Sequence, residues 1–292
     1  TVIPPGTGRF RPAVEPRGFI DARSLRLRQL GVMALQRSRF FVRAATVVVV
    51  ATACSATARL ATRPAGATAG RPPAPNGYFQ TLPAGASLPT DALCAARVHR
   101  STWEPRRQNN TANHKIVTPV NLPINTAFNA AWQKKYKPRI DGAFSGTTDE
   151  IIQWASCKWG VSDNLTRARA VQESSWVQST LGDYVPKSSG HCVPGWPGTS
   201  CPTSFGLLQS KWYFRPGTYP RTLISTAYNV DSVLAEMRGC LDGMLWFGPR
   251  SRGDVWDCTG FWFSGSWRQD DQQYIAHVQA IYTDKPWLRW NG

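Results

Sequence analysis

The chain has 292 residues, of which 42% are hydrophobic and 11% aromatic, enough apolar material for one sizeable folded core or two. Its net charge of +16 is unevenly spread: 12 arginines against two carboxylates give residues 1–71 a charge of +10, and 22 basic against 16 acidic residues give the remainder +6. A basic chain invites a nucleic-acid-binding function, but the sequence contains no helix-turn-helix, RNA-binding or zinc-finger pattern. Most of the excess also lies in a front segment that we expect to be removed.

Residues 33–58 have the features of a secretory signal peptide. Three arginines precede a short apolar run, Ala44–Ala53, which is too short to cross a bilayer as a helix, and two small-x-small sequences offer cleavage sites after it. We therefore expect a secreted or cell-wall-associated protein, with residues 1–32 forming an upstream segment. A buried core strand and lipidation at Cys54 are the alternatives.

Three further regions follow in chain order. Residues 59–90 are rich in Pro, Ala and Gly, which is typical of a flexible linker. Residues 91–146 are polar and irregular, with one short helical segment at Ala127–Tyr136, and we expect an arm that lies on the next domain. Residues 147–292 have the apolar periodicity of a compact domain.

This last domain is predicted to be built from helices. Apolar residues at helical spacing and plausible caps indicate helices from Thr147 or Thr148 to Gly160, from Ser162 to Ser175, and over Ser225–Leu241, Asp254–Phe263 and Gln269–Tyr282. No strand pattern of any length and no internal repeat is visible. The predicted fold class is mainly α.

The cysteines and histidines favour a disulfide-bonded protein over a metal protein. Seven cysteines leave six when Cys54 is set aside, an even number in an exported chain. Six cysteines allow 15 pairings, and we expect Cys94–Cys157, Cys192–Cys201 and Cys240–Cys258. No CxxC pair occurs and the histidines are dispersed, so we expect no metal site and no cofactor. The four histidines are His99, His114, His191 and His277.

A single carboxylate, Glu173, lies at the end of the helix that begins at Ser162. Its neighbours Val171 and Trp176 are apolar, and desolvation by such groups raises a carboxyl pKa toward the range where it can donate a proton near neutrality. The alternative is a surface glutamate near a helix end.

Two short motifs resemble a known enzyme family. Glu173-Ser174, followed by Gly206-Leu207-Leu208-Gln209, is similar to the Glu-Ser and Gly-Leu-Met-Gln signatures of the soluble lytic transglycosylase family, whose fold is lysozyme-like and related to goose-type lysozyme. The resemblance covers residues 148–290. It implies an exported enzyme that cuts MurNAc–GlcNAc strands of peptidoglycan, with Glu173 acting first as acid and then as base to leave a 1,6-anhydro product.

The resemblance also suggests residues that contact substrate. Tyr274 resembles the tyrosine of the family's final helix, and Asn229 a position in the helix after the second motif. The family's third motif, Ala-Tyr-Asn-Ala-Gly, has its counterpart by order at Phe261–Gly265, where Trp262 replaces the tyrosine and the asparagine is missing. We therefore expect Trp262 and Tyr274 to line the cleft.

Two other residues of the motifs are expected at the site. Ser174 is expected to cap or orient Glu173, and Gln209 to bond an N-acetyl group of the substrate or the backbone near Glu173. Both are predicted to contribute to substrate binding.

Two alternatives to a transglycosylase remain. Asp183, on the loop after the Glu173 helix, is the best second carboxylate for a muramidase that uses water. The altered third motif favours a non-catalytic cell-wall-binding protein that keeps the fold. The positive charge of the mature part suits an anionic wall polymer, and we expect a monomer that binds peptidoglycan glycan strands, without nucleic acid or a small-molecule cofactor.

Overall fold

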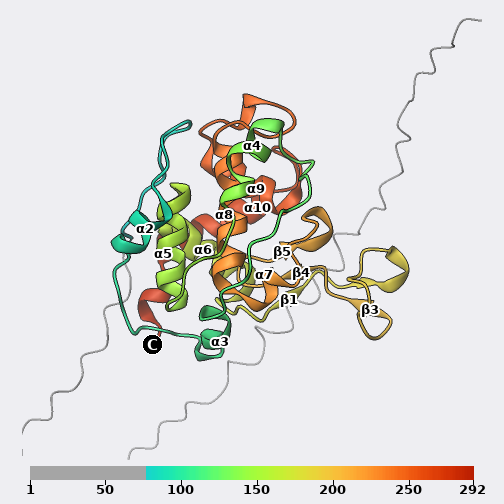
Figure 1. The fold of residues 1–292 in the computed structure, drawn as a ribbon, viewed down its shortest axis with the longest axis horizontal. Coiled ribbons are helices and arrows are strands. Elements are labelled where there is room, and N and C mark those ends of the chain that lie inside the picture. Colours follow the sequence, from blue (N-terminus) through green and yellow to red (C-terminus); the bar gives the residue numbers. More distant parts are fainter. Residues whose placement is uncertain (1–76) are drawn as a thin grey trace, which may run out of the picture. The chain divides into compact units, whose positions relative to one another are not determined.

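Two long helices, α5 (Thr148–Trp159) and α8 (Thr226–Leu241), pack against each other at the centre of the structure (Figure 1). This computed structural model describes residues 77–292, so the predicted upstream segment, signal peptide and Cys54 lie outside the described residues. A second pair, α6 (Asp163–Ser174) and α10 (Gln272–Asp284), packs beside the first. The prediction of a mainly α fold is confirmed.

Shorter elements surround these four helices. They are α2 (Asp91–Arg97), α3 (Asn110–Asn113), α4 (Ala130–Lys135), α7 (Arg221–Ile224) and α9 (Val255–Ser264), with 3-10 turns at Arg107–Asn109, Lys137–Arg139, Lys187–Ser189, Trp212–Phe214, Pro249–Ser251 and Pro286–Arg289. Between Gly77 and the chain end at Gly292, no helix is both long enough and apolar enough to span a membrane.

Local capping explains where the helices start. The Thr147 side chain accepts from the backbone N–H of Glu150, whose carboxylate accepts from Thr147 N–H, a reciprocal pair that satisfies two donors at the start of α5. Ser162 caps α6 through Leu165 N–H, as predicted. Gly160, with φ of +57°, ends α5.

Three predicted helix boundaries are corrected. The first short helix begins at Ala130 rather than Ala127, because the Asn129 side chain caps it by accepting from Trp132 N–H. The final helix begins at Gln272 rather than Gln269, because Asp270 has a positive φ that interrupts the helix. Ser175, expected on the buried stripe, is exposed beyond the end of α6.

The arm and the domain share one hydrophobic core. Trp103, Trp132 and Tyr136 of the arm are buried with the apolar faces of α5, α6 and α8. The arm lies on the domain, and the Cys94–Cys157 disulfide joins α2 to α5, both as expected.

The prediction of a flexible linker over residues 59–90 is wrong for its described part, residues 77–90. Tyr78 N–H donates to Asp163 Oδ2 (2.8 Å), and Leu82 N–H donates to the carbonyl of Gly160 (3.0 Å). The Arg238 side chain in turn donates to the carbonyl of Leu82 (3.1 Å). The composition of this segment suggested a linker. It could not reveal the attachment, because Tyr78 and Leu82 are held through backbone N–H and C=O groups, which every residue type except proline carries in full.

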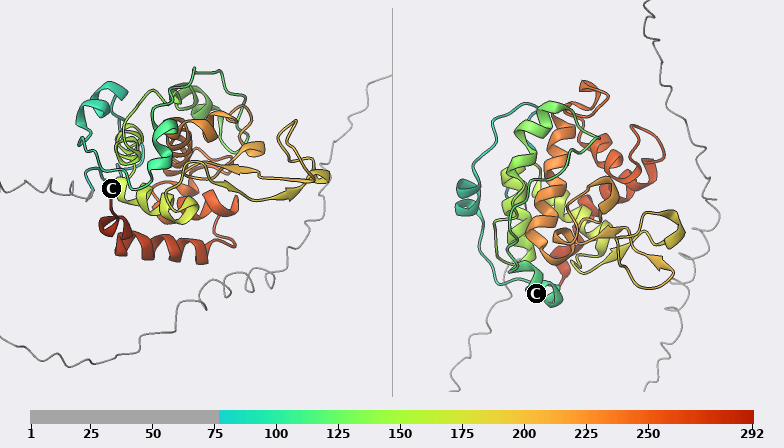
Figure 2. Two further views of the ribbon diagram at one scale, coloured as in Figure 1. Left: turned by 90° about the horizontal axis from the view of Figure 1, so that it is seen from below. Right: turned by 45° about the vertical axis from the view of Figure 1, so that its right-hand side comes forward.

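All strands of the described residues lie in the segment between α6 and α7. β1 (Leu181–Gly182), β4 (Ser204–Phe205) and β5 (Ser210–Lys211) form an antiparallel sheet in the order β1-β4-β5, with Gly182 opposite Ser204 and Ser204 opposite Lys211. β2 (Val185–Pro186) and β3 (Ser200–Cys201) pair beyond it, and this hairpin projects from the helices (Figure 2).

The three expected disulfides are confirmed. Cys192–Cys201 closes the projecting hairpin, and Cys240–Cys258 joins α8 to α9. Their Cα–Cα distances of 5.6 and 5.8 Å are ordinary for disulfides, as is 5.5 Å for Cys94–Cys157. Three such bridges indicate a protein that matures in an oxidising environment.

Candidate active site

Glu173 lies half-buried in the last turn of α6, facing the final helix. The Tyr274 hydroxyl of α10 donates a short hydrogen bond to Glu173 Oε1. The helix ends just beyond because Ser175 and Trp176 both have positive φ values, 52° and 70°. Ser174 fixes this end, since its hydroxyl donates to the carbonyl of Leu207 (2.8 Å) and so joins the two predicted motifs.

The environment makes Glu173 a weaker acid than an ordinary glutamate. Burial raises the pKa of its carboxyl to about 7, against hydrogen bonds from Tyr274 and Trp262 and the positive charge of Arg169, all of which lower it. The negative charge of Asp183 raises it further. A carboxyl group with this pKa can donate a proton at neutral pH and accept it back.

Tyr274 is held in place by the same surroundings. Its ring stacks on Phe263, with centroids 4.6 Å apart and planes within 5°. Burial, and then the charge of Glu173, raise the pKa of the Tyr274 hydroxyl well above its ordinary value, so it remains a donor. Tyr274, which the resemblance assigns to the cleft, therefore lies beside Glu173.

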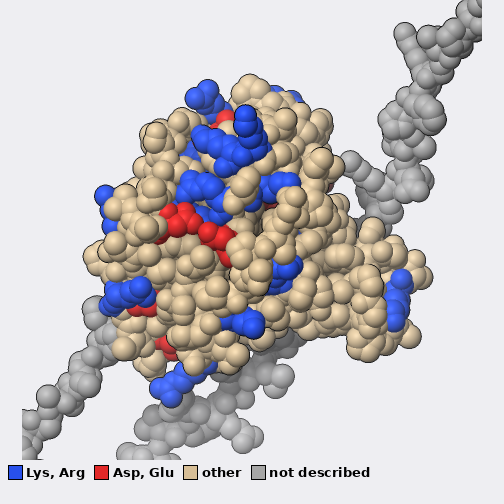
Figure 3. Space-filling model, in the orientation of Figure 1, with Lys and Arg blue, Asp and Glu red and all other residues tan. Residues whose placement is uncertain are grey.

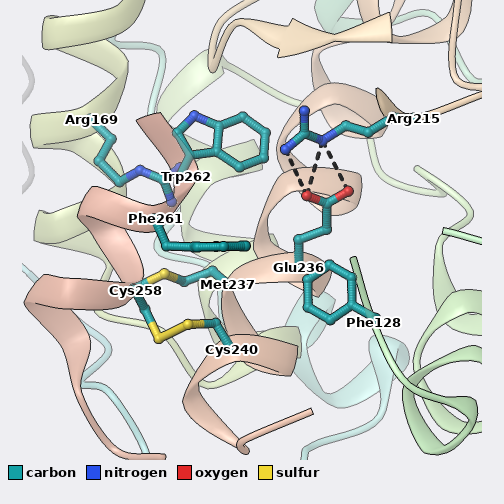
Figure 4. A pocket seen from close by; sticks show the side chains of 9 residues that line it. All are labelled: Phe128, Arg169, Arg215, Glu236, Met237, Cys240, Cys258, Phe261 and Trp262. Carbon is teal, nitrogen blue, oxygen red and sulfur yellow. Dashed lines mark hydrogen bonds and ion pairs between the residues drawn. A yellow bond between two sulfur atoms is a disulfide. The ribbon is translucent and has the colours of Figure 1, made fainter. Parts of the chain in front are cut away.

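Trp262 completes the apolar side of the site. This half-buried indole of α9 lies between two guanidinium groups, 5.2 Å from that of Arg169 and 4.0 Å from that of Arg215 (Figure 4). Arg215 also pairs with Glu236 through bonds of 2.8 to 2.9 Å. Trp262 lies close enough to Glu173 to lower the pKa of its carboxyl, and its assignment to the third motif stays a prediction.

A small pocket opens beside this indole. Its lining is mostly apolar and includes the disulfide between α8 and α9, as Figure 4 shows. The lining residues are Phe128, Arg169, Arg215, Glu236, Met237, Cys240, Cys258, Phe261 and Trp262. The sequence analysis missed both arginines. Arg169 could have been found, because it lies one helical turn before Glu173.

The second motif is a tight turn locked by two buried amides. Gly206 has φ of +85°, and a Cβ there would lie 2.3 Å from the carbonyl oxygen of Thr222, so only glycine fits. Leu208 N–H donates to Asn229 Oδ1 (2.8 Å), and Leu207 N–H to Gln178 Oε1 (3.0 Å). Asn229, singled out by the resemblance, thus supports the turn from α8.

Gln209 binds the backbone of this turn. Its side-chain amide donates to the carbonyls of Gly206 (2.8 Å) and Thr180 (3.2 Å). Of the two roles expected for Gln209, the bond to backbone is therefore the one observed. The residue has a positive φ of 46°.

Asp183 forms an ion pair near Glu173. Its carboxylate accepts from Ser204 (2.6 Å) and pairs with Lys211 Nζ (2.8 Å). Although burial opposes ionisation, the hydrogen bonds from Lys211 and Ser204 hold the pKa of Asp183 below its ordinary value. Glu173 and Asp183 therefore differ in protonation at neutral pH, one partly neutral and the other ionised.

Comparison of the chain with models of known protein families, with curated proteins and with solved structures finds no match. Within residues 77–292, no cluster of three or more His, Cys, Asp or Glu side chains could hold a metal ion.

The raised pKa of Glu173 should make stability depend on pH. Between pH 4.5, the ordinary value, and about 7, the folded state binds a proton that the unfolded state has lost, so stability falls as pH rises. Glu173→Gln should remove this loss. We expect the variant to match the wild type at pH 4 and to exceed it at pH 8 by at most about 3 kcal/mol in denaturant unfolding. A variant with no gain at pH 8 would contradict the raised pKa.

Proposed function

We propose that the protein is an exported lytic transglycosylase that cleaves peptidoglycan between MurNAc and GlcNAc, with Glu173 as acid and then base. The observation that carries this proposal is the placement of Glu173, half-buried at the end of α6 beside the hydroxyl donor of Tyr274, where burial raises its pKa to about 7. The domain is then a member of the lysozyme-like helical folds, as the motifs imply.

In this reaction protonated Glu173 gives its proton to the glycosidic oxygen as the C–O bond breaks and positive charge develops on the sugar ring. The hydroxyl of Tyr274 stabilises the carboxylate that forms. That carboxylate then takes the proton of the sugar's own 6-hydroxyl while the hydroxyl oxygen attacks C1 of the same sugar. This step closes the 1,6-anhydro ring and restores the neutral acid.

Substrate binding is proposed for the residues around this centre. The exposed ring of Phe263, which stacks on buried Tyr274, offers a flat apolar face to a sugar ring, and half-buried Trp262 follows it as the second aromatic contact. Ser174 and Gln209 act indirectly: Ser174 joins the first motif to the second, and Gln209 ties the turn of the second motif to Thr180. Lys and Arg side chains outnumber Asp and Glu on the face seen in Figure 3, which suits an anionic wall polymer.

One observation favours a second candidate function, a muramidase that uses water. Asp183 is ionised and close enough to raise the pKa of Glu173, so it could stabilise positive charge on the sugar or activate water. Its pairing with Lys211 argues against this, because the ammonium group already neutralises the carboxylate.

Mass spectrometry of purified wall digested with the protein tests the proposal. Products that end in 1,6-anhydro rings support the transglycosylase. Reducing ends support the muramidase, and the effect of Asp183→Asn on their yield would assign its role. Intact wall with tightly bound protein would instead indicate a non-catalytic wall-binding protein.

A further inference from the structure

Arg169 is fully buried, and within residues 77–292 its guanidinium forms no ion pair with a carboxylate at salt-bridge distance. Arg167 and Arg238 are also fully buried, but both pair with carboxylates, Arg167 with Asp149 and Asp163 and Arg238 with Asp242. Within residues 77–292, none of the three guanidinium nitrogens of Arg169 has a hydrogen-bond partner of normal geometry. A buried cation left in this state is costly, because desolvation is not offset by a counter-charge.

The neighbours of this guanidinium belong to the candidate active site. The Trp262 ring lies 5.2 Å away, and the cation lowers the pKa of both the Glu173 carboxyl and the Tyr274 hydroxyl, each of which burial raises. Arg169 precedes Glu173 by four residues, so both side chains lie on one face of α6. Among these neighbours, Glu173 is the group that gains a negative charge near neutral pH.

We propose that Arg169 is a positioning residue that provides the buried counter-charge for the Glu173 carboxylate and turns the Tyr274 hydroxyl proton toward Glu173 Oε1. This inference rests on the proposed function and deepens it. It explains why a cation is kept where no permanent anion faces it, since the anion is present during only part of the reaction.

The direction of the hydrogen bonds follows from what each group can do. A guanidinium donates and never accepts, so the Tyr274 oxygen can face it only with a lone pair. The single proton of Tyr274 is then free to point to Glu173 Oε1, its hydrogen-bond partner. The Trp262 indole can also only donate. Neither Tyr274 nor Trp262 therefore takes up the acidic proton of Glu173, which stays available to a substrate oxygen.

The counter-charge also matches the two steps of the reaction. Burial alone would make Glu173 too weak an acid, and a nearby cation restores part of its acidity. When the proton leaves, the new carboxylate pairs with Arg169 in a site of low polarity, where opposite charges attract strongly. An anion from solution is a poorer partner, because the guanidinium nitrogens are sealed from solvent.

The test is the titration of the Glu173 side-chain carboxyl by NMR, with ¹³C-labelled glutamate and no substrate. The chain has five glutamates, so the signals can be assigned by comparison with Glu173→Gln. Arg169→Met should raise the pKa of Glu173 by about one unit, a tenfold weaker acid. Arg169→Lys should restore much of this loss, because it returns the charge without the planar fork.

Arg215→Met is the matched control. It removes the guanidinium from the other face of the same indole, and should leave the titration of Glu173 within a few tenths of a unit of the wild type. If Arg169→Met does not fold, Arg169→Gln gives the neutral comparison with a polar side chain. An unchanged pKa in the neutral Arg169 variant that folds, or an equal shift in Arg215→Met, would overturn the inference.

This readout is independent of wall cleavage. A wild-type protein that binds wall without cutting it would refute the proposed function, yet the titration would still show whether Arg169 sets the acidity of Glu173. In an active enzyme, Arg169→Met should move the fall of kcat/KM at high pH to higher pH, with a lower maximum. A merely structural role would lower activity equally at all pH values.

Discussion

Replacing Glu173 by Gln is expected to abolish wall cleavage while the protein stays folded. The amide cannot donate the acidic proton or take one back, and loss of a general acid costs roughly 10²–10⁴ in rate, more when one group serves in both steps. The amide oxygen can still accept from Tyr274, so the local packing should persist. Release of soluble fragments from purified wall measures the loss, and binding to the same wall should be close to that of the wild type.

Asp284→Asn is the matched control for this loss. Asp284 lies at the other end of the helix that carries Tyr274 and pairs with Arg289 in solvent, both side chains being exposed. Its replacement should leave the rate unchanged, because exposed ion pairs of this kind contribute little. Near-native cleavage by Glu173→Gln would refute the proposed mechanism.

The largest loss of stability is expected from Lys158→Met. The buried ammonium of Lys158 lies 2.7 Å from Asp91, 3.0 Å from Asp141 and 3.1 Å from Asp231. Removing it leaves three carboxylates together, of which Asp231 is fully buried. Breaking a buried pair in this way costs about 3–5 kcal/mol. For a domain of this size the melting temperature should fall by roughly 6–20 °C.

Two variants sharpen this test. Lys134→Met removes an exposed lysine and should change stability by no more than about 0.5 kcal/mol. Asp231→Asn in the Lys158→Met background should recover part of the loss, because the buried charge is gone. The single amide oxygen can still accept from the backbone N–H groups of Asp141 and Gly142, while the bond from Trp159 to the other oxygen is lost. A Lys158→Met protein that unfolds like the wild type would contradict the role of this cluster in holding the arm.

Local chemistry accounts for what the sequence could predict. Caps at Thr147 and Ser162 act within one turn, so pattern alone placed α5 and α6. Glu173 and Tyr274 lie 101 residues apart, so no local pattern could show that they meet. The resemblance assigned Tyr274 to the cleft, and the reaction itself stays a proposal.

Features that depend on tertiary structure escaped prediction. Lys158 collects carboxylates from positions 91, 141 and 231, and no local spacing reveals such a cluster. Arg169 lacks a hydrogen-bond partner because no acceptor from another part of the described chain reaches it, and a sequence pattern cannot show this. Periodicity marked the apolar face of α6 but could not tell that Arg167 and Arg169 are buried with it, one paired and the other not.

The attachment of residues 77–90 has a mechanical consequence. A pull on the chain from the side before Gly77 first loads the backbone bonds of Tyr78 and Leu82, which end on Asp163 and Gly160. Asp163 begins the helix that ends at Glu173. If residues 77–90 were not attached to the domain, the same force would act first on the Cys94–Cys157 disulfide and not on α6. Tension applied to the chain before Gly77 would thus act on α6, the helix that carries Glu173.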